Sequence, residues 1–339
     1  MIKKRNLDPS LVQWIMTATG FGPGMGKIKY LCVDGSSTSQ YEPWLWDQGV
    51  KESEIFYDLA TAYAAMEAYR NDILLVLPGD HIQTAQLTWD KDATALVGCG
   101  SLNQRFQGST YVSGGIRISC VTAAVTDILN ITADYFSMYN IGTFNSAANT
   151  GNKSDINISG KNFYADHCAF RGGNNATQIA NATAGIPIWV DSAIAGGGNA
   201  MWIKNSMIGS AGNTTRTKGP GCMYFEGGAA AGFNPVIENC LLSTRCEVET
   251  GSQTCMILLE ANYAVDRELL FKGCNFYNFV ENLANKLDVC ITDECATTHT
   301  ITIDQTCTLS GVDAWATPMT YVQCSAPVGY VTGGIGLNA

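Results

Sequence analysis

Four carboxylates recur at a nearly constant spacing in the C-terminal half of this 339-residue chain. Each follows a short apolar run directly, and steps of 35, 34 and 33 positions separate them: Asp191, Glu226, Glu260 and Asp293. If the runs stack, the carboxylates form an acidic row that could bind Ca²⁺, which favours clustered oxygen ligands. Neighbouring like charges repel, so the row needs solvent, partners or a cation. Four solvated turn residues are the simpler interpretation, and we expect no resident cofactor, with Ca²⁺ as the alternative.

Histidines that could act beside these acids are few. The chain has three: His81 follows Pro-Gly-Asp, His167 lies at a repeated turn, and His299 lies in a Thr-rich segment. The repeated position of His167 predicts a structural role for it.

Three cations, Arg171, Arg245 and Lys272, fall near predicted strand ends, where each could assist a carboxylate. Their spacing identifies none of them as a catalytic base. The sequence has no Asp-Asp pair, Walker loop, zinc-ligand spacing or nucleophile elbow. Cleavage of a polysaccharide by two carboxylates stays open, because stacking supplies acid pairs at several separations.

A second repeat keeps the same period. Four apolar runs centre on small residues spaced by 34, 34 and 33 positions: Ser206, Cys240, Cys274 and Cys307. Two series with one period indicate stacked units, each too small to bury its apolar face alone. The runs are short and lack a helical period, so they are predicted strands. Without crossover helices, parallel strands can pair as successive turns of a coil, about 4.8 Å apart.

Each of these runs contains a predicted corner. Asn205, Asn239 and Gly273 precede the small central residue, and His167 holds that position in an earlier copy. Asn and Gly tolerate the left-handed conformation that a sharp bend requires. The last copy, residues 303–309, carries one extra residue and fits the pattern less well.

This pattern resembles the right-handed parallel β-helix of pectate-lyase-like proteins. Upstream, YLCVDGSS, an amphipathic stretch and then DILLVLPGDHIQTAQLTWDKDATALVGCGS look like the entry segment of that family. The resemblance implies an all-β solenoid whose first coil is covered by a helix. It implies little about activity, because this scaffold hosts many functions. Pectate lyases of this fold use clustered Asp with Ca²⁺ and an Arg, and polygalacturonase-type relatives use paired Asp and a His. The sequence identifies neither set.

We predict three segments. Residues 1–27 form an N-terminal docking arm, residues 28–325 form the β-helix domain, and residues 326–339 form an apolar, Gly-rich tail. Residues 142–155 and 171–185 are expected to be long excursions from the coil. The arm carries apolar side chains that are poorly suited to water: Leu11, Val12, Trp14, Ile15 and Met16.

A capping helix is predicted over residues 53–70. Ile55, Leu59, Tyr63 and Met66 recur at helical spacing, and Ser53 is the expected N-cap. Such a helix would cover the open end of the first coil, where unpaired strand edges promote aggregation.

The 13 cysteines are predicted to be buried free thiols. Cys240, Cys274 and Cys307 form one column, and a second column is predicted from steps of 33, 35 and 34 positions: Cys222, Cys255, Cys290 and Cys324. Side chains stacked on parallel strands have poor geometry for a disulfide. Unbridged thiols favour folding in a reducing cytosol.

Composition excludes several classes of protein. The net charge is −10, and no Lys/Arg cluster follows the first five residues, which argues against nucleic-acid binding. No apolar stretch is long enough to span a bilayer. The basic N-terminus is interrupted by Asp8-Pro9 and lacks a small-residue cleavage site, so we expect no signal peptide.

A short β-helix preceded by NLDPSLVQWIMTATGFGPGMG looks like the structural proteins of tailed-bacteriophage particles. That resemblance implies a homotrimeric virion component, on the head or as a tail spike or fibre. It would contact other virion proteins through the arm. The alternatives are a polysaccharide lyase or hydrolase, or a module that binds host surface polysaccharide. Trp44, Trp46, Trp189 and Trp202 could stack on sugars, although packing is the simpler role for them.

Overall fold

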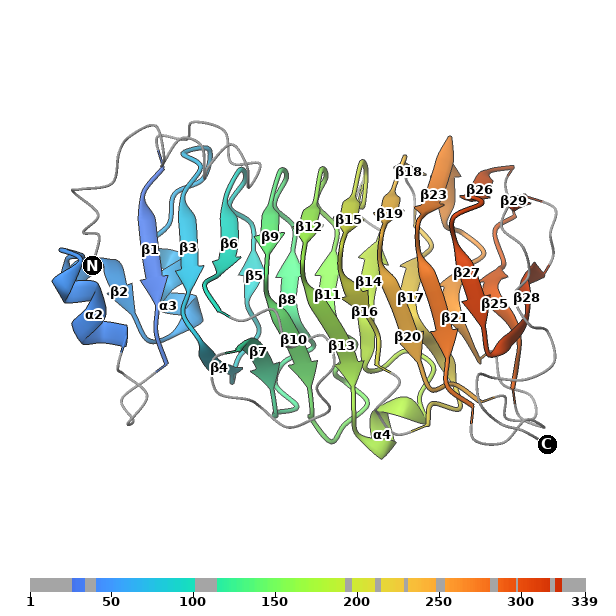
Figure 1. The fold of residues 1–339 in the computed structure, drawn as a ribbon, viewed down its shortest axis with the longest axis horizontal. Coiled ribbons are helices and arrows are strands. Elements are labelled where there is room, and N and C mark those ends of the chain that lie inside the picture. Colours follow the sequence, from blue (N-terminus) through green and yellow to red (C-terminus); the bar gives the residue numbers. More distant parts are fainter. Residues whose placement is uncertain are drawn as a thin grey trace.

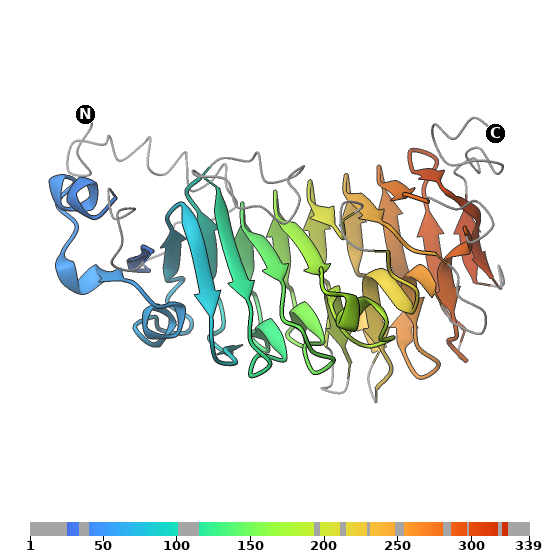
Figure 2. The same ribbon diagram turned by 90° about the horizontal axis from the view of Figure 1, so that it is seen from below.

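The computed structural model describes residues 26–33, 41–100, 115–192, 197–210, 215–228, 231–247, 254–280, 286–296, 298–317 and 321–324. Short strands stack into three sheets that run along an elongated molecule (Figures 1 and 2). Neighbouring strands of a sheet come from successive turns of the chain and pair in parallel. The predicted parallel β-helix is therefore confirmed.

Sheet A contains, in spatial order, β2 (Ile55–Phe56), β1 (Ile28–Leu31), β3 (Ile73–Val76), β6 (Ala95–Gly98), β9 (Ser137–Tyr139), β12 (Tyr164–Asp166), β15 (Trp202–Lys204), β19 (Val236–Glu238), β23 (Glu268–Lys272), β26 (Thr300–Ile303) and β29 (Val322–Cys324). Sheet B contains β4 (Gly79–Gln83), β7 (Ile116–Cys120), β10 (Gly142–Asn145), β13 (Ala169–Gly173), β16 (Met207–Ile208), β20 (Leu241–Thr244), β24 (Asn275–Asn278) and β27 (Thr308–Ser310).

Sheet C contains β5 (Thr88–Trp89), β8 (Asp127–Ile131), β11 (Ser154–Ile158), β14 (Ile186–Asp191), β17 (Gly219–Glu226), β21 (Thr254–Leu259), β25 (Leu287–Asp293) and β28 (Val312–Thr317). A further parallel pair joins β18 (Ala231–Phe233) to β22 (Ala264–Asp266). The two predicted excursions are shorter than expected, because β10 and β13 occupy their first residues and β11 begins at Ser154. Residues 146–153 and 174–185 do leave the sheets. Gly- and Asn-rich composition marked the turns and obscured the short strands beside them.

The interior of the coil is one continuous apolar core. Side chains of equal kind meet across successive turns of sheet C, and each of the following is fully buried: Ile156, Ile188, Met223, Ile257 and Ile291. This stacking explains the constant period, since each side chain packs on its counterpart one turn away.

The corners between sheets A and B use left-handed residues, as predicted. His167, Asn205, Asn239 and Gly273 have φ angles of 55°, 49°, 51° and 61°. A Cβ added to Gly273 would lie 2.4 Å from Asn239 Oδ1, so close stacking as well as conformation favours glycine there. The last corner holds one extra residue: the register joins Phe271 to Ile303 before it and Asn275 to Thr308 after it.

All 13 cysteines are free, and the first predicted column is confirmed. The Cys274 backbone N–H donates to Cys307 Sγ at 3.4 Å. The Cys240 and Cys274 thiols each donate to a carbonyl of the previous coil, at 3.6 and 3.2 Å.

The second predicted column was wrong. Cys222 and Cys290 face the core, Cys255 joins an apolar cluster on the other face of sheet C, and Cys324 lies in sheet A. The register of β17 shifts between Pro220 and Met223, and a one-residue slip moves a side chain to the opposite face.

The N-terminal end of the coil is capped, but by a shorter helix than predicted. The chain there forms α2 (Tyr41–Asp47), the 3₁₀ turn η2 (Glu52–Glu54), β2 and then α3 (Leu59–Ala64). Ile55 and Phe56 pair with β1 instead of extending a helix. The N-cap of α3 is Asp58, not Ser53.

The α3 helix contributes to the core through the predicted face. Leu59 of α3 and Met66, just past the end of the helix, are buried in the core cluster, and Tyr63 packs against it. The Lys91 ammonium closes the C-terminal end of α3 by donating to the carbonyls of Tyr63, Ala64 and Met66 at 2.7, 3.0 and 2.7 Å. A further short helix, α4 (Ala176–Ile179), lies between β13 and β14.

The predicted docking arm lies outside the described residues apart from Gly26 and Lys27, and so does the predicted tail, residues 326–339. Among the described helices, none is long and apolar enough to cross a membrane.

Candidate functional site

Three of the four predicted acids form a row on the outer face of sheet C. The register places Asp191 opposite Glu226, and the pairing of Phe225 with Leu259 places Glu226 beside Glu260. Each of these acids follows an inward-facing residue of its strand. Their side chains therefore lie on the outside of the coil.

The fourth predicted acid does not continue the row. Asp293 pairs with Leu259 and not with Glu260, so Glu294 takes the next position in the row. Asp293 is 6% exposed, and its Oδ2 lies 2.9 Å from His299 Nε2. The repeat in the sequence does not reveal this one-residue shift, because the number of residues per turn does not fix which residues of neighbouring strands pair.

Hydrogen-bond donors of the protein already contact two carboxylates of this acidic row. The Trp189 indole N–H donates to Glu226 Oε2 at 2.7 Å. The Gly227 backbone N–H donates to Glu260 Oε2 at 2.8 Å. Partnered carboxylates of this kind are stable on a sheet without a cation, and Ca²⁺ binding here stays a prediction.

A second row, on sheet A, alternates in charge. Asp166, Lys204, Glu238 and Lys272 are register partners on four successive turns. Lys204 Nζ lies 3.6 Å from Asp166, and Lys272 Nζ lies 3.0 Å from Glu238. We call this set the charge ladder. Opposite charges on neighbouring strands stabilise a sheet.

Aromatic rings accompany the charge ladder. The rings of Tyr139 and Tyr164 are 5.4 Å apart, and those of Tyr164 and Trp202 are 5.7 Å apart. Trp202 is 40% exposed, whereas Trp189 is 3% exposed. The Lys204 ammonium lies over both Tyr164 and Trp202, at 5.2 and 5.1 Å from the ring centroids. Packing is thus the role of Trp189, and Trp202 presents an aromatic surface to solvent.

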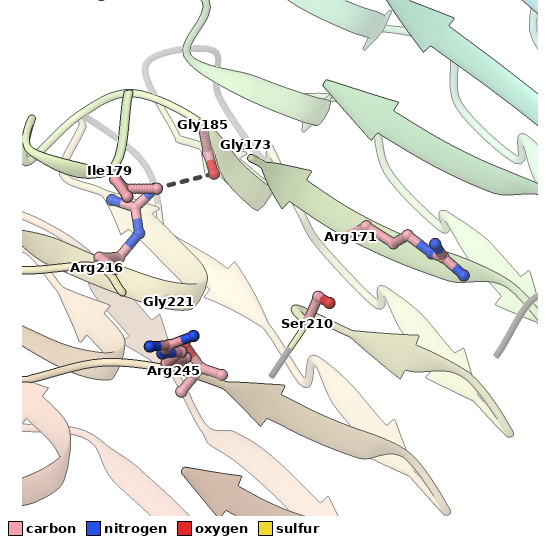
Figure 3. Close-up of a pocket in the computed structure, with 9 residues that line it drawn as sticks. Arg171, Gly173, Ile179, Gly185, Ser210, Arg216, Gly221 and Arg245 are labelled. Atoms are coloured by element: carbon pink, nitrogen blue, oxygen red, sulfur yellow. Dashed lines mark hydrogen bonds between the residues drawn. The ribbon is translucent and has the colours of Figure 1, made fainter. Parts of the chain in front are cut away.

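A small pocket lies where sheet B passes into sheet C, and three arginines line it (Figure 3). Its volume of about 20 Å³ admits a water molecule or the oxygen end of one anionic group. Arg171 comes from β13, Arg216 precedes β17 and Arg245 follows β20. The other lining residues are small or uncharged: Gly173, Ile179, Gly185, Ser210, Gly221 and Thr244.

Backbone carbonyls hold Arg216 in this arginine pocket. Arg216 is 4% exposed, and its guanidinium donates at 2.7 to 3.3 Å to the carbonyl oxygens of Asn181, Ala184, Gly185 and Lys218. Burial lowers the pKa of Arg216 but leaves it charged, because arginine titrates far above neutral pH. Burial and the nearby Arg117 also lower the pKa of Arg171. The sequence interpretation noted Arg171 and Arg245 near strand ends and missed Arg216, because only the turn between sheets B and C brings the three together.

The described histidines are all engaged. His81 is buried with Nε2 2.9 Å from the Leu77 carbonyl oxygen, and burial lowers its pKa. His167 Nδ1 lies 2.6 Å from Asp166 Oδ1 at its corner, which fits its predicted structural role. Lys272, a candidate assistant to an acid, belongs to the charge ladder.

The chain matches no protein-family model and no curated protein sequence. Among solved structures, it is similar to the pectin methylesterase PemA from Erwinia chrysanthemi, with a TM-score of 0.50 and 13% identity over 85% of this chain and 80% of that one. For pectate lyase Pel9A the TM-score is 0.41 and the identity is 13%, over 91% of this chain and 82% of that one. For Geobacillus virus E2 ORF18 the TM-score is 0.32 and the identity is 11%, over 79% of this chain and 56% of that one.

At such identities the likeness concerns the fold alone. The stacked parallel sheets and the superposition on PemA agree with the resemblance expected from the sequence. The chain therefore has the right-handed parallel β-helix fold, which it shares with PemA.

Proposed function

We propose that this protein is a structural subunit of a tailed-bacteriophage virion, on the head surface or in a tail spike or fibre. It acts through assembly and surface contact, as a homotrimer that attaches to other virion proteins through residues 1–27. The rigid stacked core suits such a role, because each turn of the coil is supported by its neighbours.

The observation that carries this proposal is an aromatic surface at the N-terminal end of the rod. Trp44 and Trp46 on α2 are 44% and 50% exposed, and Tyr57 is 39% exposed. The Tyr57 hydroxyl donates to Glu42 of α2, so these side chains share one end of the molecule. Figure 1 places α2 at that end, beyond β2. Exposed tryptophans are typical of protein interfaces, and the predicted arm enters the domain at β1, beside β2.

Particles assembled in the presence of variant subunits test the proposal. Quantitative mass spectrometry of purified, salt-washed particles should find the wild-type chain at a fixed copy number. The double variant Trp44→Ser, Trp46→Ser should be incorporated at least tenfold less. Trp202→Ser, which removes an exposed tryptophan on sheet A, is the matched control. Absence of the wild-type chain from washed particles would contradict the proposal.

A second candidate function is the binding of an acidic polysaccharide on the host surface. The arginine pocket supports it, because Arg216 and Arg245 place positive charge beside the pocket, where it would attract a carboxylate or sulfate oxygen. The exposed ring of Trp202 on sheet A adds a stacking surface for a sugar, on a different part of the coil.

Calorimetric titration with acidic and neutral polysaccharides tests this candidate. Binding of acidic chains that weakens at least tenfold in Arg245→Gln, with neutral chains inert, would support it. Following unsaturated products by ultraviolet absorbance, and new reducing ends, separates binding from cleavage. Turnover abolished by Glu226→Gln or Glu260→Gln would establish an enzyme and overturn the non-catalytic proposal.

A further inference from the structure

Three potential metal ligands converge in the turn that leads from β25 to β26. They are the Asp293 carboxylate, the Cys295 thiol and the His299 imidazole, and their ligand atoms all lie within 4.8 Å of one another. All three residues are buried, at 6%, 9% and 6% exposure. Among the described residues, this is the one group of three such side chains that meets this distance.

The surrounding contacts orient these side chains toward one another. The Cys295 backbone N–H donates to Asp293 Oδ1 at 3.1 Å, and His299 Nε2 lies 2.9 Å from Asp293 Oδ2. The Tyr321 ring packs on the imidazole with the centroids 4.6 Å apart. The first two contacts hold the three residues close together, and the Tyr321 ring is an outer contact that fixes the orientation of the imidazole.

We propose that Asp293, Cys295 and His299 bind a Zn²⁺ ion that holds this turn together, with a water molecule in the fourth tetrahedral position. One sulfur, one imidazole nitrogen and one carboxylate oxygen are a donor set that suits Zn²⁺. Ca²⁺, in contrast, takes oxygen ligands. Neighbouring ligand atoms of a tetrahedral zinc site are about 3.3 to 3.8 Å apart, given its bond lengths. The present separations therefore require only small side-chain movements, with the metal taking the place of the His299–Asp293 hydrogen bond.

The position of this site gives it a structural role. Asp293 ends β25, and His299 directly precedes β26, so a bound ion would tie the turn between two strands near the C-terminal end of the coil. Both strands are paired on either side, β25 with β21 and β28, and β26 with β23 and β29, so the ion would fix the turn between two strands that are already held in their sheets. The Cys295 thiol lies 3.6 Å from the Glu260 carbonyl oxygen of the preceding turn, so the ion would also lie against that turn.

The competing account is a buried His–Asp ion pair with a bystander thiol, and metal content separates the two. The full chain is produced with and without added Zn²⁺ and purified without chelator, and its metal is measured by inductively coupled plasma mass spectrometry. We expect about one zinc per chain in the wild type and at least tenfold less in Cys295→Ser and His299→Gln. The control is Cys99→Ser, which removes an exposed thiol far from the site and should retain the metal.

A spectroscopic measurement on the wild type keeps the test decisive if a variant fails to fold. Protein loaded with Co²⁺ in place of Zn²⁺ should show the thiolate-to-cobalt charge-transfer absorption of a cysteine ligand. Folded wild type that carries no stoichiometric metal after zinc loading, or that binds cobalt without this absorption, overturns the proposal. So does zinc retained equally by both site variants.

Discussion

A single left-handed residue turns the chain from sheet A to sheet B on successive coils. Asn205, Asn239 and Gly273 hold this position with φ angles between 49° and 61°. A side chain with a Cβ and no local hydrogen-bonding group costs about 1 to 2 kcal/mol in that conformation. The residue type at each corner is therefore set by backbone conformation and not by solvent exposure.

Asn239→Ala should destabilise the fold by about 1 kcal/mol relative to Asn239→Gly, because alanine resists the left-handed conformation. Urea unfolding would measure the difference, provided that the unfolding free energy of both variants has the same dependence on urea concentration. Equal midpoints for the two variants would show that the corner does not select against a Cβ.

Burial controls the chemistry of the Asp127 carboxyl group. Asp127 is 5% exposed, and burial raises its pKa from 3.8 to about 6, although the Ser154 hydroxyl donates to it at 2.6 Å. Because the folded state holds the proton more tightly than the unfolded state, its stabilising contribution is complete below pH 3.8. That contribution is lost as the pH rises through about 6.

Asp127→Asn should therefore leave stability at pH 4 nearly unchanged and raise it at pH 8 by up to about 3 kcal/mol. Unfolding free energies measured from pH 4 to 8 for both proteins check this. Glu52→Gln, an exchange of an exposed acid in η2, is the control. Parallel pH profiles for wild type and Asp127→Asn would contradict the assigned shift.

At the scale of elements, the strands of sheet A are matched in charge as well as in shape. Lys204 lies between Asp166 on one neighbouring strand and Glu238 on the other. Its ammonium also lies over the rings of Tyr164 and Trp202. Ion pairing and cation–π contact thus both contribute at one position of the charge ladder.

Lys204→Glu should lower the unfolding free energy by about 1 kcal/mol more than Lys204→Met, because it places three like charges on adjacent strands. The methionine variant keeps an apolar stem and removes only the charge. Raising the salt concentration to about 1 M should remove most of the difference between the two variants. A difference that is independent of salt would point to packing instead of repulsion.

At the scale of the whole molecule, the coil is held together without covalent cross-links. All 13 cysteines are free, and eleven are buried. Burial raises the pKa of Cys168 to about 12, which keeps this thiol protonated and unreactive at neutral pH. Stability rests instead on the continuous core and the strand pairing between successive turns.

Thermal unfolding should therefore have the same midpoint, within about 1 °C, with and without a phosphine reductant that does not strip zinc, since a lost disulfide typically costs 2–5 kcal/mol. Calorimetry at one scan rate measures it, and thiol counting in denaturant should find all the cysteines reactive. A midpoint that falls by several degrees in reductant would reveal a cross-link.

The sequence by itself determined the period of the coil, the corner residues and the cysteine column at Cys240, because each follows from short-range spacing. A side chain that stacks on its own counterpart has to recur once per turn, and a left-handed corner selects Asn or Gly wherever it occurs. These requirements are visible without coordinates.

Only the tertiary structure determined which residues pair on neighbouring strands and which distant side chains come together. The shift in β17 broke the second cysteine column, and a one-residue offset turned Asp293 from the acidic row toward Cys295 and His299. The arginine pocket joins residues from three turns of the coil. Such groupings depend on the position at which each strand begins after a loop, and the loops differ in length. The free energy of the whole packed coil determines these positions, and no local sequence pattern does.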